Sequence, residues 1–175
     1  MFVAIYPPEE TRRAMLEALV ARRSAAPHRV VPTEQVHMTV QFVGEAREKE
    51  VEEVAESVRR SAAGIGAFSL TPVRLISLPA SGVPRLIAME TDAPAGLLEL
   101  HRRLAMRLAR SPRAKTGDRF LPHLTLCRFS GVGRPERVEA RVEIPVFECR
   151  GVSVMRSVLR AEGAEHSVVE EVELG

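Results

Sequence analysis

The sequence predicts an α+β fold composed of two similar halves, and three observations support this prediction. Short apolar runs of strand length recur along the chain, and three longer segments carry apolar residues at helical spacing between charged ones. The phrase His-x-Thr, followed by an aliphatic residue, occurs once in each half. Because strands and helices recur in a similar order around each copy, we expect a duplicated α+β unit with mixed or antiparallel sheets.

The first half is predicted to contain two strands and two helices. Residues 2–6 form an apolar run closed by a Pro-Pro pair, which is typical of a buried strand followed by a break. A helix is expected to begin at Pro8, because proline and the acidic residues after it suit a helix N-terminus. A loop over 24–32 is then followed by a strand over 36–43 and an amphipathic helix over 47–62.

The second half is predicted to contain more strands. Residues 68–78 and 85–90 are expected to form two strands joined by a Pro- and Gly-rich connection of hairpin character. A third helix is expected from Pro94 to about Arg110, and His101 on its apolar stripe is interpreted as a histidine at the edge of the core. After the second His-x-Thr strand, the sequence predicts a short helical piece and three strands, at 135–141, 146–149, 151–160 and 167–174.

The repeated phrase is the strongest functional signal in the chain. Its two copies are Val36-His37-Met38-Thr39-Val40 and Pro122-His123-Leu124-Thr125-Leu126. Because side chains alternate between the two faces of a strand, His37 and Thr39 share one face, and so do His123 and Thr125. Chance would give only about 0.2 His-x-Thr matches in a chain of this composition. If the halves pack around a pseudo-twofold axis, His37 faces His123 across a central cleft.

Two facing imidazoles suit the hydrolysis of a cyclic phosphodiester. One ring can take a proton from water while the other gives a proton to the departing oxygen, and an unperturbed pKa of about 6.5 lets both forms coexist. Each threonine hydroxyl can donate to a phosphate oxygen on which charge gathers. A single copy would be better interpreted as a structural strand histidine, but two matching copies favour a joint site. We expect no cofactor, because two histidines without further ligands make a poor zinc site.

The composition is compatible with an RNA substrate without requiring one. The formal net charge is +2 and nearly all cations are arginines, whose planar fork matches phosphate, although genome composition is the plainer explanation of the excess. There is no apolar run long enough to span a bilayer and no signal-peptide pattern, so we expect one compact cytoplasmic unit. Cys127 and Cys149 lack a metal-type spacing and are interpreted as buried thiols.

Together these motifs resemble the two-histidine phosphoesterase superfamily, and within it the bacterial and archaeal RNA 2′,3′-cyclic phosphodiesterases, once called 2′-5′ RNA ligases. The resemblance covers nearly the whole chain, with landmarks near 1–8, 37–44, 84–90, 120–128 and 157–174. It implies a single bilobal domain over 1–175, with two mainly antiparallel sheets facing a central cleft and helices on the outside. It also implies hydrolysis of 2′,3′-cyclic phosphate at RNA ends to a 2′-phosphate, with 2′-5′ ligation as the reverse reaction.

The resemblance also implies a role for each motif residue. His37 would be the acid that protonates the leaving 3′ oxygen, and His123 the base that activates water. Thr39 and Thr125 would donate hydrogen bonds to the phosphate. The acid and base roles exchange in the ligation direction.

Phe42 and Arg128 would hold the terminal base by stacking, according to the same resemblance. Each lies an odd number of residues after its histidine, so a β-bulge or the strand end must turn it toward the cleft. A core position for Phe42 is the competing interpretation. Burial of Arg128 without a partner would be costly, which favours a site role.

Two other functions remain open at this stage. One is a phosphodiesterase for a small cyclic nucleotide, such as ADP-ribose cyclic phosphate, and the other is a non-catalytic module that binds RNA ends. The expected partners are RNA ends with 2′,3′-cyclic phosphates, including tRNA-derived ones, or such nucleotides, and the protein is expected to be a monomer that does not bind membranes. Near the C-terminus the family often has Gly-x-x-Tyr, whereas this chain has Gly163-Ala164-Glu165-His166, and His166 is interpreted as a surface residue.

Overall fold

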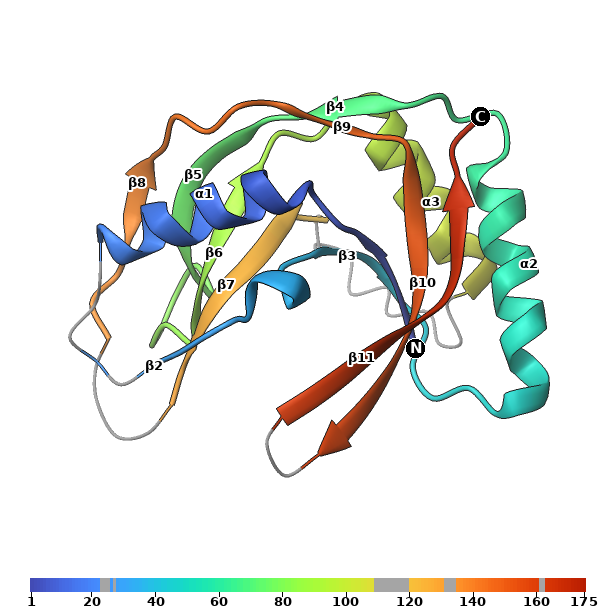
Figure 1. The fold of residues 1–175 in the computed structure, drawn as a ribbon, viewed down its shortest axis with the longest axis horizontal. Helices are drawn as coiled ribbons and strands as arrows, with labels where there is room; N and C mark the ends of the chain where they lie inside the picture. Colours follow the sequence, from blue (N-terminus) through green and yellow to red (C-terminus); the bar gives the residue numbers. More distant parts are fainter. Residues whose placement is uncertain (23–25, 27, 109–119, 131–134, 161–162) are drawn as a thin grey trace.

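The structure is a computed structural model that describes residues 1–22, 26, 28–108, 120–130, 135–160 and 163–175 (Figure 1). Its elements, in chain order, are β1 (Phe2–Ile5), α1 (Glu9–Val20), β2 (His28–Val30), η1 (Thr33–Gln35), β3 (Met38–Phe42), η2 (Glu48–Glu50), α2 (Val51–Ala62), β4 (Phe68–Leu70), β5 (Pro72–Leu78), β6 (Leu86–Thr91), α3 (Ala95–Leu108), β7 (His123–Phe129), β8 (Glu139–Arg141), β9 (Phe147–Cys149), β10 (Gly151–Arg160) and β11 (Gly163–Glu173).

The described strands form one large sheet and one small sheet. The large sheet has nine strands, in the order β11-β10-β1-β3-β7-β6-β5-β8, with β2 paired beside β7, and the small sheet contains β4 and β9. Every pairing between described strands is antiparallel. The predicted α+β class with mainly antiparallel strands is therefore confirmed.

The two halves of the large sheet join at one residue pair. Strands β3 and β7 meet where Met38 opposes Leu124, and both side chains are fully buried. Beyond this pair, β3 continues beside β1 and β7 continues beside β6. The two sheets expected to face a cleft are thus continuous through the strands that carry the His-x-Thr motifs.

The helices lie against both halves of the large sheet, with α2 and α3 on the half that contains β11 and β3 and α1 on the half that contains β7. Helix α1 contacts β7, whereas α3 contacts β3 and α2 contacts β11 (Figure 1). Each helix buries a stripe at helical spacing, and in α3 this stripe consists of Leu97, Leu100, Leu104 and Leu108. Burial of a leucine side chain stabilises the fold by about 1.5–3 kcal/mol, so these stripes fix the helices on the sheet.

Three sequence-based expectations about elements were wrong. The piece expected to be helical over 135–141 contains strand β8, because its residues pair with Arg74–Ile76 of β5. The loop expected over 24–32 contains β2, which pairs with β7. The single strand expected over 68–78 is divided between the two sheets as β4 and β5. In all three places pairing with a distant strand, rather than local pattern, decides the structure. The expected end of the third helix near Arg110 lies outside the described residues.

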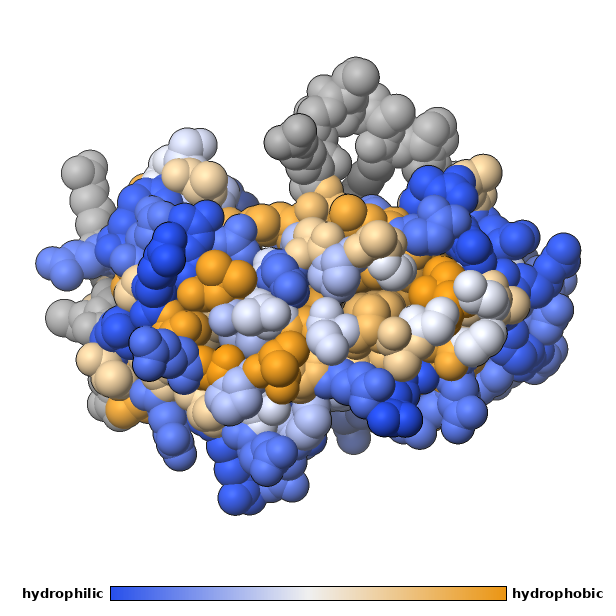
Figure 2. Space-filling view, turned by 90° about the horizontal axis from the view of Figure 1, so that it is seen from above, coloured by the Kyte–Doolittle hydropathy of each residue, from blue (hydrophilic) through white to orange (hydrophobic). Residues whose placement is uncertain are grey.

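The surface is mixed in character. Seen from above, apolar and polar side chains intermingle in the middle of the face, and hydrophilic side chains gather toward both ends (Figure 2).

Cys127 and Cys149 are buried free thiols, as expected. None of the helices in the described ranges is long and apolar enough to cross a membrane.

Candidate active site

The antiparallel register brings the four motif side chains onto one face of the sheet. Since Met38 opposes Leu124, Thr39 lies beside His123 and His37 lies beside Thr125. The alternate residues of both strands are buried in the core, which leaves the histidines and threonines on the partly exposed face. The structure thus places His37, Thr39, His123 and Thr125 together.

Both motif histidines are oriented by the same local hydrogen bond. The Nδ1 of His37 donates to the backbone carbonyl oxygen of Gln35 at 2.7 Å, and the Nδ1 of His123 donates to that of Leu121 at 2.8 Å. A carbonyl can only accept, so the neutral ring must carry its proton on Nδ1. In each ring Nε2 is therefore the nitrogen available for proton exchange with a substrate.

Two matching bulges follow the motifs. In β3, Ala4 opposes Thr39 while Val3 opposes Gln41, which leaves Val40 as the extra residue. In β7 the shift leaves Leu126 as the extra residue, because Ala88 opposes Thr125 and Ile87 opposes Cys127. A bulge reverses the alternation of faces beyond it. Beyond each bulge, residues that follow the histidine by an odd number of positions therefore lie on the motif face. Phe42 and Arg128, each five residues after its histidine, meet this condition, as the sequence-based expectation required.

Phe42 and Arg128 both lie at the surface on this face. Phe42 is 72% exposed, so the competing interpretation of a core residue is wrong. It opposes Phe2 across the strands, and the two ring centroids are 6.5 Å apart. Arg128 is exposed as well. The argument that burial of Arg128 would be costly therefore does not apply. The remaining reason to expect a site role for Arg128 is its position next to the motif.

A cluster of rings surrounds His37. Its ring stacks on Phe2 at 5.0 Å between centroids and lies 5.3 Å from Tyr6 and 5.4 Å from His166. The expectation that His166 is a surface residue was wrong, because β11 carries its half-buried ring against both His37 and Phe2. Its Nδ1 is buried and has no hydrogen-bond partner among the described residues. The sequence signal that could have located it was its place in the family's Gly-x-x-Tyr position, where an aromatic ring is usual.

This environment changes the ionisation of His37. Burial lowers its pKa to about 4, which outweighs the opposing effect of the hydrogen bond to the Gln35 carbonyl. The positive charges of His166, Arg128 and His123 lower it further. Burial also lowers the pKa of His166. In the free protein at neutral pH, His37 is therefore a neutral ring with an unprotonated Nε2.

Two further histidines lie outside this cluster. The Nδ1 of His28 donates to the carbonyl oxygen of Ala26 at 2.9 Å. The Nδ1 of His101 donates to the carbonyl oxygen of Val40 at 2.7 Å, and its ring stacks on Phe120 with centroids 4.0 Å apart. His101 is half-buried and satisfied by the backbone, in agreement with its interpretation as a histidine at the edge of the core.

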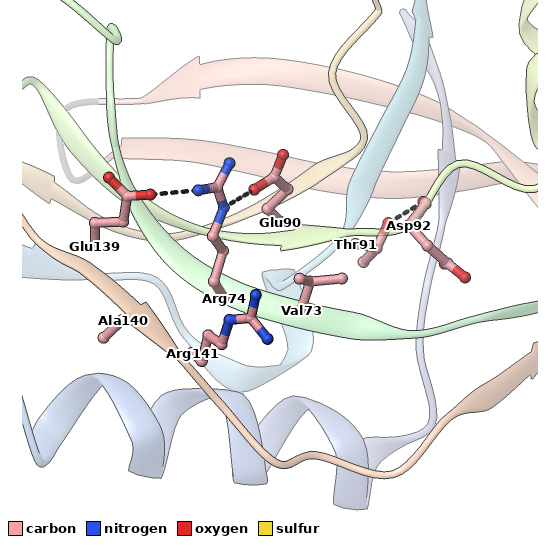
Figure 3. A pocket seen from close by; sticks show the side chains of 8 residues that line it. All are labelled: Val73, Arg74, Glu90, Thr91, Asp92, Glu139, Ala140 and Arg141. Carbon is pink, nitrogen blue, oxygen red and sulfur yellow. Dashed lines mark hydrogen bonds and ion pairs between the residues drawn. The ribbon is translucent and has the colours of Figure 1, made fainter.

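A cavity of about 490 Å³ lies beside the second motif strand (Figure 3). It is lined by residues of β5, β6 and β8, and Glu90 on its wall opposes His123 across the strands. Arg74 lies between Glu90 and Glu139 and is hydrogen-bonded to both (Figure 3). Two carboxylates already neutralise Arg74, and no motif side chain lines the cavity. We therefore do not expect the cavity to be the place of the reaction.

The donor set offers little for a metal ion. Within the part of the chain that the structure describes, no three side chains of His, Cys, Asp or Glu type cluster closely enough to hold one. The chemical resources of the face are two imidazoles, two hydroxyls and an arginine, which suit acid-base catalysis at a bound anion.

Comparison with known proteins agrees with this geometry. A family model described as the 2′-5′ RNA ligase superfamily matches residues 7–158. The chain belongs to the 2′-5′ RNA ligase superfamily. The family resemblance expected from the motifs is thereby confirmed.

Relatives in this superfamily span most of the chain. It is 29% identical to an RNA 2′,3′-cyclic phosphodiesterase of Thermus thermophilus, over 99% of this chain and 89% of the relative. A protein of the same name from Aquifex aeolicus is 29% identical over 83% of this chain and 81% of the relative.

Solved structures show the same fold. The crystal structure of TT0787 of Thermus thermophilus has a TM-score of 0.84 at 27% identity and covers 99% of this chain and 96% of that one. The crystal structure of E. coli LigT complexed with 3′-AMP has a TM-score of 0.80 at 20% identity, with coverage of 99% and 96%. At that identity the second likeness shows the fold alone.

Proposed function

We propose that the protein hydrolyses the 2′,3′-cyclic phosphate at RNA ends to a 2′-phosphomonoester, with His37 and His123 as the acid-base pair. The observation that carries this proposal is the register that sets the two His-x-Thr motifs side by side on one face, with the Nδ1 of each ring bound to a backbone carbonyl. The name shared by the relatives from Thermus thermophilus and Aquifex aeolicus supports the substrate. In this proposal the protein acts as a monomer without a metal.

The reaction requires one proton to be taken and one to be given. Water attacks phosphorus as its proton passes to one histidine, the bond from phosphorus to the 3′ oxygen breaks, and the other histidine protonates that oxygen. Thr39 and Thr125 donate to the non-bridging oxygens, while Phe42 and Arg128 flank the terminal nucleoside. If the 5′ hydroxyl of a second RNA end attacks phosphorus in place of water, the bond from phosphorus to the 3′ oxygen breaks in the same way, and the product is a 2′-5′ phosphodiester, which is 2′-5′ ligation.

The ionisation of His37 bears on which ring is the acid. If His37 protonates the 3′ oxygen, as the family resemblance implies, its pKa of about 4 must rise when the substrate binds. The negative charge of a phosphate beside the ring acts in this direction. The opposite assignment, in which neutral His37 takes the proton from water, needs no such rise. The pH dependence of kcat/KM of His37→Ala distinguishes the two assignments, because the activity that remains should rise with pH if His123 is the base and fall with pH if His123 is the acid.

The test is hydrolysis of an oligonucleotide with a 2′,3′-cyclic end in the presence of a chelator. We expect turnover by the parent and a loss of about 10²–10⁴-fold in kcat in each of His37→Ala and His123→Ala, since each removes one proton-transfer group. His28→Ala is a matched control, because His28 makes the same kind of carbonyl bond outside the site.

Four outcomes would contradict the proposal. Unchanged turnover in both motif variants would exclude the two-histidine mechanism, and loss of parent activity with the chelator would indicate a metal-dependent reaction. Faster hydrolysis of ADP-ribose cyclic phosphate than of RNA ends would favour the small-molecule alternative. Binding of RNA ends without any turnover would favour the non-catalytic alternative.

A further inference from the structure

The motif face of the sheet continues beyond the catalytic pair into two arginines. Strand β2 pairs with β7 on the same side as β3, and Arg29 directly opposes Arg128 in this register. Cross-strand partners share a face. The side chains along β7 therefore form three successive pairs, and these are His123 with Thr39, Thr125 with His37, and Arg128 with Arg29.

The arginine pair carries charge that the described protein does not neutralise. Both Arg29 and Arg128 are exposed, and no carboxylate oxygen among the described residues lies within 4.0 Å of either guanidinium. In contrast, Arg59 is paired with three carboxylates and Arg74 with two. Like charges directly opposite each other destabilise a sheet, so this pair has a cost that an anion would offset.

The position of the pair relates it to the reacting phosphate. Arg128 follows Thr125 by three residues, one of which is the bulge, and this spacing corresponds to about 7–10 Å along the strand. With long side chains added, the two guanidinium groups reach a group one nucleotide away from the phosphate held between the threonines. Guanidinium groups bind phosphate through paired hydrogen bonds, which makes a phosphodiester the fitting ligand.

We propose that Arg29 and Arg128 form a subsite for the phosphodiester that joins the terminal nucleotide to the preceding one. This inference rests on the proposed function and deepens it, because it makes RNA chain ends better substrates than 2′,3′-cyclic mononucleotides. Arg29 is the specificity-determining residue, since Arg128 also lies near the terminal nucleoside.

The experiment compares two substrates with the same terminal base, a 2′,3′-cyclic mononucleotide and a trinucleotide with a 2′,3′-cyclic end. In the parent, kcat/KM is expected to be higher for the trinucleotide. In Arg29→Ala this preference should fall by about tenfold, which corresponds to the loss of one charge-assisted contact. Arg29→Lys, which keeps the charge without the fork, should restore it in part. Arg60→Ala removes an exposed arginine from α2 and should leave the preference unchanged.

Salt dependence provides a second readout. For binding of the 2′-phosphorylated trinucleotide, the slope of log K against log salt concentration should weaken by about 0.7 in Arg29→Ala, as expected for one lost phosphate contact on a single strand. An equal preference and an equal slope in Arg29→Ala and parent would overturn the subsite. If the parent hydrolyses neither substrate, the proposed function fails, and the salt slope still decides whether Arg29 contacts the chain.

Discussion

The residue with the most unusual environment is His37, whose ring is enclosed by Phe2, Tyr6 and His166. Burial lowers its pKa to about 4 in the folded protein, whereas an unfolded chain would have the ordinary value of 6.5. Between these values the unfolded chain binds more protons than the folded one. The free energy of unfolding therefore increases as the pH rises through this window. The increase due to His37 is complete above about pH 6.5.

We predict that His37→Leu reduces this pH dependence. From pH 4 to 6.5 the parent should gain about 3 kcal/mol more in the free energy of unfolding than the variant, because the shift corresponds to that energy difference between protonation states. Urea unfolding at several pH values measures it. Equal pH dependence in the two proteins would show that the ring titrates normally when folded.

His37 also shows what the sequence could and could not predict about the site. The alternation of strand faces predicted that His37 and Thr39 share a face, and the repeat predicted a second pair opposite them. The structure places all four side chains on one face, but each histidine lies beside the threonine of the other motif rather than directly opposite the other histidine. The position of His166 depends on how far the β10–β11 ribbon extends past β1, which no local pattern reports. Its ring was therefore assigned to the surface.

At the scale of elements, the two bulged strands are the parts that shape the site. The bulge residue Val40 opposes no residue of β1, and its carbonyl oxygen instead accepts a hydrogen bond from His101 of α3. The ring of His101 also stacks on Phe120, shortly before the second motif. His101 thus contacts the chain next to both motifs, and we infer that it helps to position them.

We predict that His101→Ala destabilises the protein by about 1–3 kcal/mol, because it leaves the half-buried carbonyl of Val40 without a donor. It should also lower kcat/KM by displacing the bulge, while the pH profile keeps the shape of the parent's because neither motif histidine is changed. His101→Gln, which can still donate, should restore part of both losses. Full activity of the alanine variant would refute the positioning role.

Element types were predicted better than pairings. The helices over Glu9–Val20, Val51–Ala62 and Ala95–Leu108 were expected from their apolar stripes, which report burial directly. Strands β2 and β8 are three residues long and lie beside partners distant in sequence, so their short segments carry too little periodicity to be recognised. The need for a bulge after each motif could be deduced from face parity, but its location could not.

At the scale of the whole molecule, the site exists only where the two halves meet. The single Met38–Leu124 pair lies beneath all four motif side chains and joins the half-sheets. Neither half alone contains both histidines. The relative placement of the two histidines, the proposed acid and base, therefore depends on the packing of this junction rather than on either half.

We predict that Leu124→Ala lowers the free energy of unfolding by about 2–5 kcal/mol, the usual cost of a cavity at a fully buried leucine. Activity should decrease more than the folded fraction does, because the junction positions the motifs. Leu98→Ala on the exposed side of α3 is the matched control and should change stability by less than about 0.5 kcal/mol. Circular dichroism with parallel assays separates folding from turnover, and normal activity per folded molecule would argue against this dependence.

The carbonyl bonds that orient the two histidines have a consequence for how this site tolerates change. A backbone carbonyl does not ionise and does not depend on the side chain of its residue, so substitutions at Gln35 or Leu121 leave the acceptor in place. The orientation of both rings thus depends on main-chain acceptors, which do not change with pH. Such a site can retain the orientation of its two rings while the side chains around it change.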